Sequence, residues 1–371
     1  MIKLQRVTKV YPDGTKAVED VSLDVNDGEL CVLLGPSGCG KTTTMKLINR
    51  LIPLTAGKIL IDGVDISQLD EDELRTNIGY AIQDIGLFPH MTVGRNIETV
   101  PVLKGWDKAR RKERVEELLN LVRMSPAEFV EKYPSELSGG QRQRVGVARA
   151  LGADPPILLM DEPFGAIDPI TRVGLQDEFL KIQHEIKKTI IFVTHDIYEA
   201  IKMADKIALM SGGHLVQYDS PANLLYRPKN EFVEDFVGAD RALKALQLVR
   251  VKEVMWKSPP TAKVEEELRA AAERMEQEGL DELVVVTSDG KFLGRVGKAV
   301  VAQGSTVKEA MESSDVVATA EMVLNDALSL MLSSGVNTLA VVEESNRVEG
   351  LLTFDVIQKS LSQAVQRGEG G

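Results

Sequence analysis

The stretch "CVLLGPSGCGKTTTMKLI", from Cys31 to Ile48, constrains the fold of this 371-residue chain more than any other. It reads as a short buried strand, then the pattern G-x-x-x-x-G-K-T, then a helix. Gly35, Gly38 and Gly40 allow a tight backbone turn whose N–H groups point inward, and the helix N-terminus adds its own donors. This order predicts a nucleotide-binding α/β domain of the P-loop type, with functional groups at the carboxyl ends of buried parallel strands.

The residues of this loop have separate expected roles. Lys41 is expected to reach the β- and γ-phosphates of a bound nucleotide, and Thr42 to offer its hydroxyl to Mg²⁺. The neighbouring backbone donors complete the phosphate site. The predicted nucleotide contacts in the loop are Gly35, Pro36, Ser37, Gly38, Cys39, Gly40, Lys41, Thr42 and Thr43.

A second stretch, "PPILLMDEP", supplies the complementary acidic part of such a site. Its four apolar residues predict a buried strand that ends in Asp161 and Glu162. We expect Asp161 to hold Mg²⁺ through water and Glu162 to polarise the attacking water. Acidic residues often follow strands, so this pair indicates nucleotide hydrolysis only because a phosphate loop lies upstream.

Composition narrows the class of protein. The chain is 43% hydrophobic and 27% charged, without an apolar run near the ~18 residues that cross a bilayer. The N-terminus "MIKLQRVTKVYPDG" lacks the apolar core of a signal peptide, so we expect a cytosolic chain unless a partner brings it to a membrane. The net charge of −12 argues against a nucleic-acid partner. Cys31 and Cys39 are interpreted as small reduced residues.

The pattern of apolar and polar residues divides the chain into several parts. Residues 1–237 alternate short apolar runs with amphipathic stretches, and 238–248 is interpreted as a linker. Beyond it, "VKEVM" recurs as "VKEAM", "EGLDELVVV" as "SGVNTLAVV", and Gly294 matches Gly350 at one constant offset. We therefore predict two copies of one βαβ-type unit, at 249–306 and 307–363, followed by a frayed tail at 364–371.

The phosphate loop, the stretch "LSGGQ" and "LLMDEP" together resemble the nucleotide-binding domains of ABC transporters over about residues 1–237, with a helical subdomain at about 88–152. The resemblance implies a homodimer in which two domains pack head to tail. The phosphate loop of one chain and "LSGGQ" of the other would then hold the same ATP. Ser138, Gly139, Gly140 and Gln141 are therefore expected to contact ATP bound by the partner chain, which suits a helix N-terminus with Ser138 as its cap.

Four further positions match the family's motifs. Tyr11 lies where an aromatic ring stacks on adenine, and His195, in "FVTHD", where a histidine contacts the γ-phosphate and orders the attacking water. Gln83 matches the glutamine between the Mg²⁺ site and the surface that contacts the membrane subunit, and Asp168 the loop that couples the two active sites. Ile167 departs mildly from the family, which more often has leucine there. The resemblance therefore implies catalytic roles for Glu162, His195, Lys41 and Gln83, and metal contacts by Thr42, Gln83 and Asp161.

The cargo is inferred by similarity alone. "IQDIGLFPHMTV" and "LINRLIPLTAGKILIDGVDI" resemble ATPase subunits of importers for glycine betaine, carnitine, choline and similar quaternary-ammonium osmolytes. Phe88, Pro89 and His90 fall in the region that faces the membrane subunit's coupling helix. The resemblance implies two copies of this chain at the cytoplasmic face of the membrane, two integral-membrane permease subunits and an extracytoplasmic substrate-binding protein.

Two other functions are considered. One is an importer for another small solute, such as methionine, a polyamine or an amino acid. The other is a non-transport ABC ATPase that acts on ribosomes or DNA. Proteins of that second kind usually carry two such domains in one chain or a long coiled-coil insertion before the signature, and neither pattern occurs in this sequence.

The repeated part resembles a tandem pair of CBS domains over about 249–363, most clearly in "GLLTFDVI" at Gly350. Such pairs commonly bind adenine nucleotides, for which Thr353 and Asp355 are candidate contacts. The first repeat reads "GRVGKAVV" there, with neither an acid nor a hydroxyl, and Asp355 follows Thr353 by two residues where the family more often has three. We therefore expect a ligand at the dimer interface, or none, rather than AMP or ATP in the usual pocket.

Three roles are open for this repeated part. It could bind a regulatory ligand such as cyclic di-AMP, which similar osmolyte importers sense. It could sense ionic strength through contacts of its charged residues, or it could hold the dimer together. A regulatory ligand must bind one state of the dimer better than another in order to shift activity.

Overall fold

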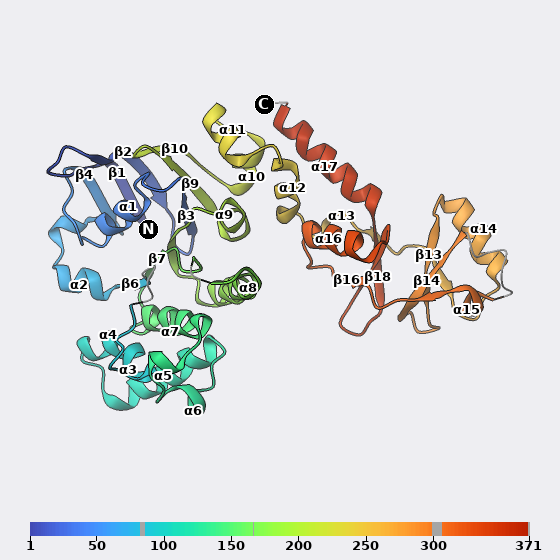
Figure 1. Ribbon diagram of the computed structural model, residues 1–371, viewed down its shortest axis with the longest axis horizontal. Helices are drawn as coiled ribbons and strands as arrows, with labels where there is room; N and C mark the ends of the chain where they lie inside the picture. Colours follow the sequence, from blue (N-terminus) through green and yellow to red (C-terminus); the bar gives the residue numbers. More distant parts are fainter. Residues whose placement is uncertain (82–85, 166, 299–305, 370–371) are drawn as a thin grey trace. The chain divides into compact units, whose positions relative to one another are not determined.

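The computed structural model describes residues 1–81, 86–165, 167–298 and 306–369. The chain divides into two compact units. The first comprises Met1–Leu224 and Pro228–Phe236, and the second comprises Leu225–Arg227 and Val237–Gly371. Figure 1 shows the elements of both units along the chain.

The larger sheet of the first unit has the strand order β10-β9-β3-β8-β7-β6. Its strands are β3 (Leu30–Leu34), β6 (Ile78–Ala81), β7 (Ile157–Asp161), β8 (Thr189–Val193), β9 (Lys206–Ser211) and β10 (His214–Asp219). All neighbours are parallel except β10, which runs antiparallel to β9. Every residue of β3, β7 and β8 is buried, which explains why these strands read as continuous apolar runs.

A smaller antiparallel sheet, ordered β2-β1-β4-β5, forms the other layer of this unit. Its strands are β1 (Ile2–Val10), β2 (Lys16–Val25), β4 (Ala56–Ile61) and β5 (Val64–Asp65). Helix α1 (Lys41–Ile48) contributes Met45 and Leu47 to a core that also contains Leu4 and Val21 from the small sheet and Leu33 from the large one. The helix that follows the phosphate loop is thus fixed by apolar contacts with both sheets.

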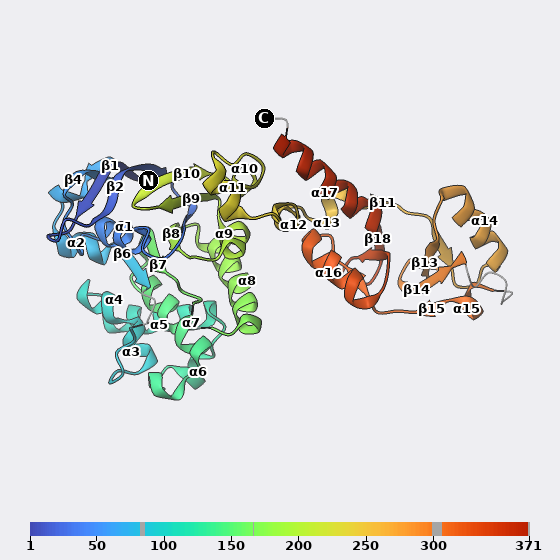
Figure 2. The same ribbon diagram turned by 45° about the horizontal axis from the view of Figure 1, so that its top comes forward.

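Helices fill the segment between β6 and β7, and Figures 1 and 2 show them as a separate cluster of this unit. They are α3 (Val93–Ile97), α4 (Thr99–Leu103), α5 (Lys108–Leu121), α6 (Pro126–Phe129), η2 (Pro134–Glu136) and α7 (Gly139–Leu151). The remaining helices up to Val237 are η1 (Ile66–Gln68), α2 (Glu71–Thr76), α8 (Pro169–Ile186), α9 (Ile197–Met203), α10 (Pro221–Tyr226) and α11 (Glu231–Val237). None of the helices in the described ranges is long and apolar enough to cross a membrane.

The second unit contains two copies of one arrangement, as the sequence repeat predicted. The first copy consists of α13 (Val251–Val254), β11 (Trp256–Lys257), β12 (Thr261–Lys263), α14 (Leu268–Glu278), β13 (Glu282–Val286) and β14 (Phe292–Gly297). The second consists of α15 (Val307–Ala310), β15 (Glu312–Ser313), β16 (Val317–Ala318), α16 (Leu324–Ser334), β17 (Thr338–Val342) and β18 (Val348–Thr353). Helices α14 and α16 both end at a glycine with φ of +66°, Gly279 and Gly335.

The two copies exchange strands. The sheets have the orders β12-β13-β14-β15 and β11-β18-β17-β16, so the short strand that opens each copy completes the sheet of the other. Side chains from both sheets then pack into one apolar cluster, which consists of Val284, Val286, Phe292, Ala340, Val342 and Leu351. The pair of repeats is therefore held together by backbone pairing as well as by a shared core.

Two segments differ from the expectations. Residues 238–248, expected as a linker, contain α12 (Arg241–Ala245) and η3 (Leu246–Leu248), and Leu246 is buried in the core of the second repeat. Residues 364–369, expected as a frayed tail, continue α17, which runs Phe354–Glu369. Apolar contacts of Ile357 and Leu361 with the same core anchor the start of that helix, and such contacts cannot be read from a polar C-terminal sequence.

Candidate functional site

The loop between β3 and α1 requires glycine at defined positions. Gly35 has φ of +146° and Gly40 has φ of +105°. A Cβ atom at Gly35 would lie 2.2 Å from the Met210 carbonyl oxygen, and one at Gly40 would lie 2.4 Å from the Ala17 carbonyl oxygen. Backbone from neighbouring strands approaches the loop too closely for any side chain, so its N–H groups stay open to a ligand.

Lys41 lies at the start of α1 with only 6% of its surface exposed. Its ammonium donates hydrogen bonds to the carbonyl oxygens of Gly35 at 2.6 Å and Pro36 at 3.0 Å. A pocket of about 390 Å³ opens beside it. The residues that line this pocket are Ser37, Gly38, Gly40, Lys41, Thr42, Thr43, Glu162 and His195. The structure therefore brings together the loop and the two strand-end residues that the sequence selected.

The predicted metal contacts Thr42 and Asp161 are adjacent. The Thr42 hydroxyl donates to Asp161 Oδ1 at 3.1 Å, and burial raises the pKa of the Asp161 carboxyl, against the opposing hydrogen bond from Thr42. Mg²⁺ prefers oxygen ligands and takes few from the protein when phosphates supply others. In the described ranges no group of three or more His, Cys, Asp or Glu side chains could hold a metal. Gln83, the third expected metal contact, lies outside the described residues.

The side chains of Glu162 and His195 lie next to each other in the lining of the pocket. His195 Nδ1 lies 3.2 Å from Glu162 Oε1, and the histidine side chain is 59% exposed. Glu162 adopts a left-handed φ of +43°, and its N–H donates to the Val193 carbonyl oxygen at 3.0 Å. This bond ties the end of β7 to the end of β8. A carboxylate and an imidazole are thereby held together at the pocket edge, where one can orient a water molecule and the other a phosphate oxygen.

The "LSGGQ" stretch forms the N-terminus of α7. Ser138 Oγ accepts from the Gln141 N–H at 3.2 Å, and Gln141 Oε1 accepts from the Ser138 N–H at 2.9 Å, which together make a capping box. Ser138 and Gly139 are exposed, so the helix presents its positive end to solvent. Within the described ranges, Ser138 does not line the pocket that contains Lys41. The structure does not bring the two phosphate-binding stretches of one chain together at that pocket.

Two further predicted residues serve local structure in this chain. Asp168 caps α8 by accepting from the Thr171 N–H at 3.0 Å. Tyr11 follows β1, and the Lys9 ammonium lies 5.3 Å from the centre of its ring. That ammonium also donates to the Pro53 carbonyl oxygen at 2.8 Å, so the charge beside the ring is fixed. Neither Tyr11 nor Asp168 lines the pocket beside Lys41 within the described residues.

Sequence reasoning missed Asn96, which is fully buried and fixes the loop that begins with Phe88. Its Oδ1 accepts from the Phe88 N–H at 2.8 Å, and its Nδ2 donates to the carbonyl oxygens of Phe88, Met91 and Thr92 at 3.0 to 3.2 Å. One amide thus adds side-chain hydrogen bonds to the backbone bonds that Phe88 and Thr92 already accept from Met91 and Asn96. A single asparagine inside a helical pattern gives no sequence signal for such a role.

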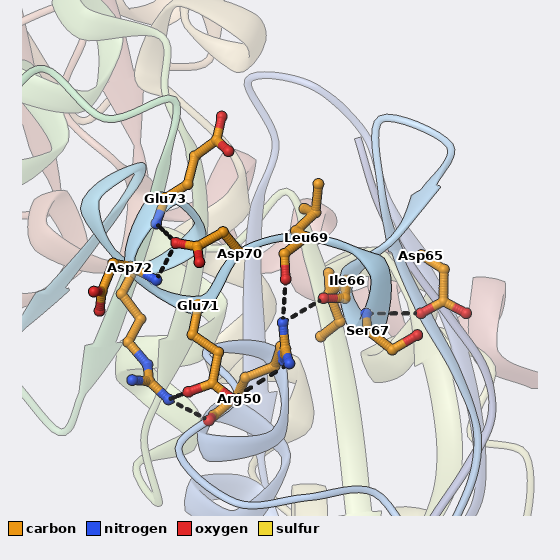
Figure 3. Close-up of polar contacts among 10 residues, drawn as sticks. Arg50, Asp65, Ile66, Ser67, Leu69, Asp70, Glu71, Asp72 and Glu73 are labelled. Atoms are coloured by element: carbon orange, nitrogen blue, oxygen red, sulfur yellow. Dashed lines mark hydrogen bonds and ion pairs between the residues drawn. The ribbon is translucent and has the colours of Figure 1, made fainter.

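A second pocket, of about 360 Å³, lies beside this loop and is lined in part by Phe88, Arg149 and Arg75. Arg75 Nη2 donates to the Arg50 carbonyl oxygen at 2.8 Å and to Glu71 Oε2 at 2.7 Å. Figure 3 shows that Arg50, just beyond α1, reaches the Ile66 and Leu69 carbonyl groups and the Glu71 carboxylate. This network links the end of the phosphate-loop helix to the wall of the second pocket.

The candidate tail residues Thr353 and Asp355 lie at the junction of β18 and α17. Thr353 Oγ1 accepts from the Val356 N–H at 3.3 Å, so its hydroxyl caps the helix, while Asp355 is exposed. In the first repeat, Gly297 occupies the position equivalent to Thr353, and the position equivalent to Asp355 lies outside the described residues. The two repeats therefore differ at the place where the family most often binds a nucleotide.

Comparisons with known proteins agree with this geometry. Residues 18–165 match the family model for the ABC transporter, and 251–299 and 307–362 match that for the CBS domain. The glycine betaine/carnitine/choline transport ATP-binding protein OpuCA of Bacillus subtilis is 47% identical over 97% of both chains. The osmoprotectant import ATP-binding protein OsmV of Salmonella typhimurium is 46% identical over 99% of this chain and 98% of its own.

Two solved structures match about two thirds of the chain. A dimeric ATP-binding cassette in a post-hydrolysis state, bound to ADP and Pi, is 35% identical with a TM-score of 0.54, and the match covers 60% of this chain and 99% of the other. A cassette from Clostridium perfringens, part of the ABC transporter complex cbiONQ, is 26% identical with a TM-score of 0.57, over 67% of this chain and 94% of its own.

The chain belongs to the family of ABC transporter ATP-binding subunits, which are ATPases. The relatives that match it over nearly their whole length are named for the transport of osmoprotectants, glycine betaine, carnitine or choline. The predictions of an ABC-type nucleotide-binding fold and of a tandem CBS module are confirmed.

Proposed function

We propose that this chain is the ATP-hydrolysing subunit of an importer for a quaternary-ammonium osmolyte, namely glycine betaine, carnitine or choline. The observation that carries the proposal is similarity over 97% of both chains to a transport ATP-binding protein for these three solutes, through the nucleotide-binding unit and the repeats alike. An importer for methionine, a polyamine or an amino acid is the alternative. Its nucleotide site would be the same, because the cargo does not contact this chain.

The pocket supports a division of roles in ATP hydrolysis. Lys41 and the glycine-rich loop would bind the β- and γ-phosphates. Thr42 and Asp161 would hold Mg²⁺, which would neutralise phosphate charge. Glu162 orients the attacking water, and His195, 3.2 Å from it, contacts the γ-phosphate oxygen. Attack of water on a γ-phosphate depends on positioning and charge neutralisation more than on covalent chemistry.

The position of "LSGGQ" supports a head-to-tail homodimer. Within the described ranges the pocket beside Lys41 contains no residue of this stretch, whereas the exposed N-terminus of α7 can receive an anion. Ser138, Gly139, Gly140 and Gln141 would bind the γ-phosphate held by a second copy, and Asp168 would lie between the two sites. Tyr11 would stack on the adenine.

The pocket beside Phe88 and Arg149 supports contact with a permease subunit. Two permease subunits and an extracytoplasmic substrate-binding protein would complete the importer. This chain would then lie at the cytoplasmic face of the membrane. Gln83, which precedes the Phe88 loop, would relate this contact to the Mg²⁺ site.

The CBS pair is proposed to regulate transport by binding cyclic di-AMP or another adenine nucleotide. The difference between the repeats at Thr353 and Gly297 supports a ligand at an interface between copies rather than one in each repeat. Truncation after Val237, where the second unit begins, tests this role. If uptake by the truncated chain responds equally to osmolarity and to cyclic di-AMP, the regulatory role is wrong and dimerisation remains.

Uptake measurements test the main proposal. The chain is produced with its membrane and binding-protein partners in cells that lack osmolyte transport, and labelled glycine betaine is offered at low and high osmolarity. ATP-dependent uptake that carnitine or choline inhibits, and methionine does not, is the expected result. Uptake that responds only to methionine or to another unrelated solute would overturn the assigned cargo and leave the ATPase intact.

A further inference from the structure

A buried carboxyl group lies close to the catalytic pocket and has no part in the roles described above. Glu199, on α9, is four residues beyond His195 and is only 7% exposed. Ionisable side chains are seldom buried unless they are paired. The hydrogen-bond partners of Glu199 therefore indicate the role of its carboxyl group.

Glu199 receives hydrogen bonds from two directions. The Gln176 Nε2 of α8 donates to Glu199 Oε1 at 3.0 Å, and the Thr194 hydroxyl donates to the same carboxyl group. Thr194 Oγ1 in turn accepts from the Asp196 N–H at 3.0 Å, which leaves the hydroxyl proton for Glu199. Gln176, Thr194 and Glu199 are all buried, so these bonds are shielded from water.

These bonds connect the segment that carries His195 with helix α8, which begins beside Asp168. His195 stands between Thr194 and Asp196, so the segment that carries the imidazole is held on both sides. Gln176 belongs to α8, and the Arg172 Nη2 of the same helix donates at 2.8 Å to the Ile167 carbonyl oxygen, next to the residue that caps α8. One carboxyl group thus contacts the helix of the Asp168 loop and the segment of His195.

We propose that Glu199 is a positioning residue, which holds His195 in register with α8 so that hydrolysis depends on the position of the Asp168 loop. The inference rests on the proposed role of His195. Glu199 does not line the nucleotide pocket within the described ranges, so its effect on the reaction passes through Thr194.

The surrounding charges give this role a dependence on pH. Burial raises the pKa of Glu199, and the hydrogen bonds from Thr194 and Gln176 oppose this shift without cancelling it. The Asp196 carboxylate at the start of α9 also raises it, and the Arg172 guanidinium of α8 lowers it. The ionised form accepts both hydrogen bonds, so hydrolysis should decline on the acid side at a higher pH than an ordinary glutamate would cause.

Glu199→Gln in the full-length chain tests the proposal. An amide has one accepting oxygen and no charge, whereas the carboxylate has two accepting oxygens and a charge that strengthens both hydrogen bonds. We therefore expect kcat for ATP hydrolysis to fall about ten-fold or more, with ATP affinity changed less than about two-fold. The acid-side decline of kcat, followed from about pH 5 to about pH 8, should move to lower pH in the variant, because the amide at position 199 does not titrate. Glu29→Gln is the matched control, because Glu29 is also 7% exposed but accepts from the Asn26 N–H at the opposite end of β3.

A second substitution keeps Glu199 itself intact. Gln176→Met removes one donor, so kcat should fall and its acid-side decline should move to higher pH, because the pKa of Glu199 rises when the donor is lost. Gln183→Met on the same helix is its control, since Gln183 is also buried but donates to the carbonyl oxygens of Gly28 and Lys188.

Unchanged kcat and an unchanged acid-side decline in Glu199→Gln would overturn the inference. So would equal losses in Glu199→Gln and Glu29→Gln that follow their loss of thermal stability, because such losses would indicate a purely structural role. His195→Ala tests the proposed role of His195 separately from that of Glu199. If that variant hydrolyses ATP normally, the role of His195 is wrong, whereas failure of Glu199 alone leaves that role intact.

Discussion

Glu162 occupies a backbone conformation that residues other than glycine rarely adopt, with φ of +43°. Its N–H donates to Val193, and its carbonyl oxygen accepts from the Gly165 N–H at 3.0 Å. A residue held in this region costs of order 1–3 kcal/mol and persists where its surroundings fix it. The turn aims the carboxylate at the pocket, so the strain lies where the chemistry requires an exact direction.

Glu162→Gln should separate ATP binding from hydrolysis. The amide keeps the size of the side chain but cannot accept a proton from water, so the rate of phosphate release should fall about 10²- to 10⁴-fold. ATP should still bind, and a dimer should accumulate with ATP in size-exclusion chromatography. Only monomers with ATP, or a persisting turnover, would contradict the assigned role.

Glu282, in the CBS pair, is a half-buried acid of a different kind. It accepts a hydrogen bond from the Thr338 hydroxyl of the other repeat. Burial raises the pKa of Glu282, the charge of Arg295 opposes this shift, and the charges of Glu312 and Asp281 add to it. Because the folded pKa lies above the ordinary value of 4.5, this group stabilises the fold fully below that value, and its contribution is lost as pH rises through the folded pKa.

Glu282→Gln should remove this pH dependence. The stability of the variant relative to the parent chain should therefore increase as pH rises from 4.5 through the raised pKa of Glu282. The chain has two tryptophans, and in a Trp106→Phe background Trp256 alone reports the unfolding of the second unit. Urea midpoints measured at a series of pH values check the prediction. Parallel curves for parent and variant would refute it.

At the scale of elements, close approach of backbone decides where glycine is required. A Cβ atom on Gly79 of β6 would lie 2.3 Å from the Ala150 carbonyl oxygen of α7 and 2.5 Å from Leu158 Cδ2. On Gly174, in the exposed part of α8, a Cβ atom would meet no described atom within 4 Å. The same substitution should therefore act in opposite directions at these two glycines.

Gly79→Ala should destabilise the first unit by about 1–3 kcal/mol through overpacking. Gly174→Ala should stabilise it by about 0.5–1 kcal/mol, because alanine loses less entropy in a helix. Urea unfolding followed by Trp106 fluorescence in a Trp256→Phe background measures both effects. Two shifts of the same sign would show that the contacts of β6 with α7 do not limit the size of this residue.

Sequence patterns predicted the elements that carry a strong local signal. The buried strands β3 and β7 and the repeat could be read in advance, because burial on both faces leaves a continuous apolar run and a constant offset reveals a repeat. The exchange of β11 and β15 could not, since two-residue strands have no pattern of their own. The helical nature of 238–248 also depends on contacts with the second repeat.

The residues of the site also differ in whether the sequence gives a local signal for them. Lys41, Thr42, Asp161, Glu162 and His195 belong to motifs whose spacing reflects strand ends that meet at one sheet edge. Asn96, Gln176 and Glu199 act through hydrogen bonds between segments distant in sequence or through burial, and single residues of these types are too common to indicate such a role. Sequence thus predicted residues that meet around the pocket beside Lys41, but not the buried hydrogen bonds behind them.

At the scale of the whole molecule, a head-to-tail homodimer predicts complementation between two inactive variants. Lys41→Ala and Ser138→Arg should each abolish most hydrolysis. In a mixed dimer one site carries both changes, while the other combines an unaltered Lys41 with an unaltered Ser138. Mixing equal amounts should restore up to about a quarter of the parent rate if chains exchange at random and the sites act independently.

Phosphate release by the mixture, compared with the sum of the two variants alone, measures this effect. Mixing two chains that both carry Lys41→Ala is the control for added protein. A mixture no more active than the sum of its parts would mean that Ser138 does not complete the pocket of a second copy, or that one intact site is insufficient for turnover.

The strand exchange in the CBS pair also has a consequence for synthesis. β11 is translated early in this unit, but it pairs with β18, which leaves the ribosome only when nearly the whole unit has been made. β11 must therefore wait without its partner strand while the nucleotide-binding unit, already released, can fold. A premature stop codon before β18 would remove the partner of a strand far upstream. A lesion just before the codons of β18 would thus damage the beginning of the second unit.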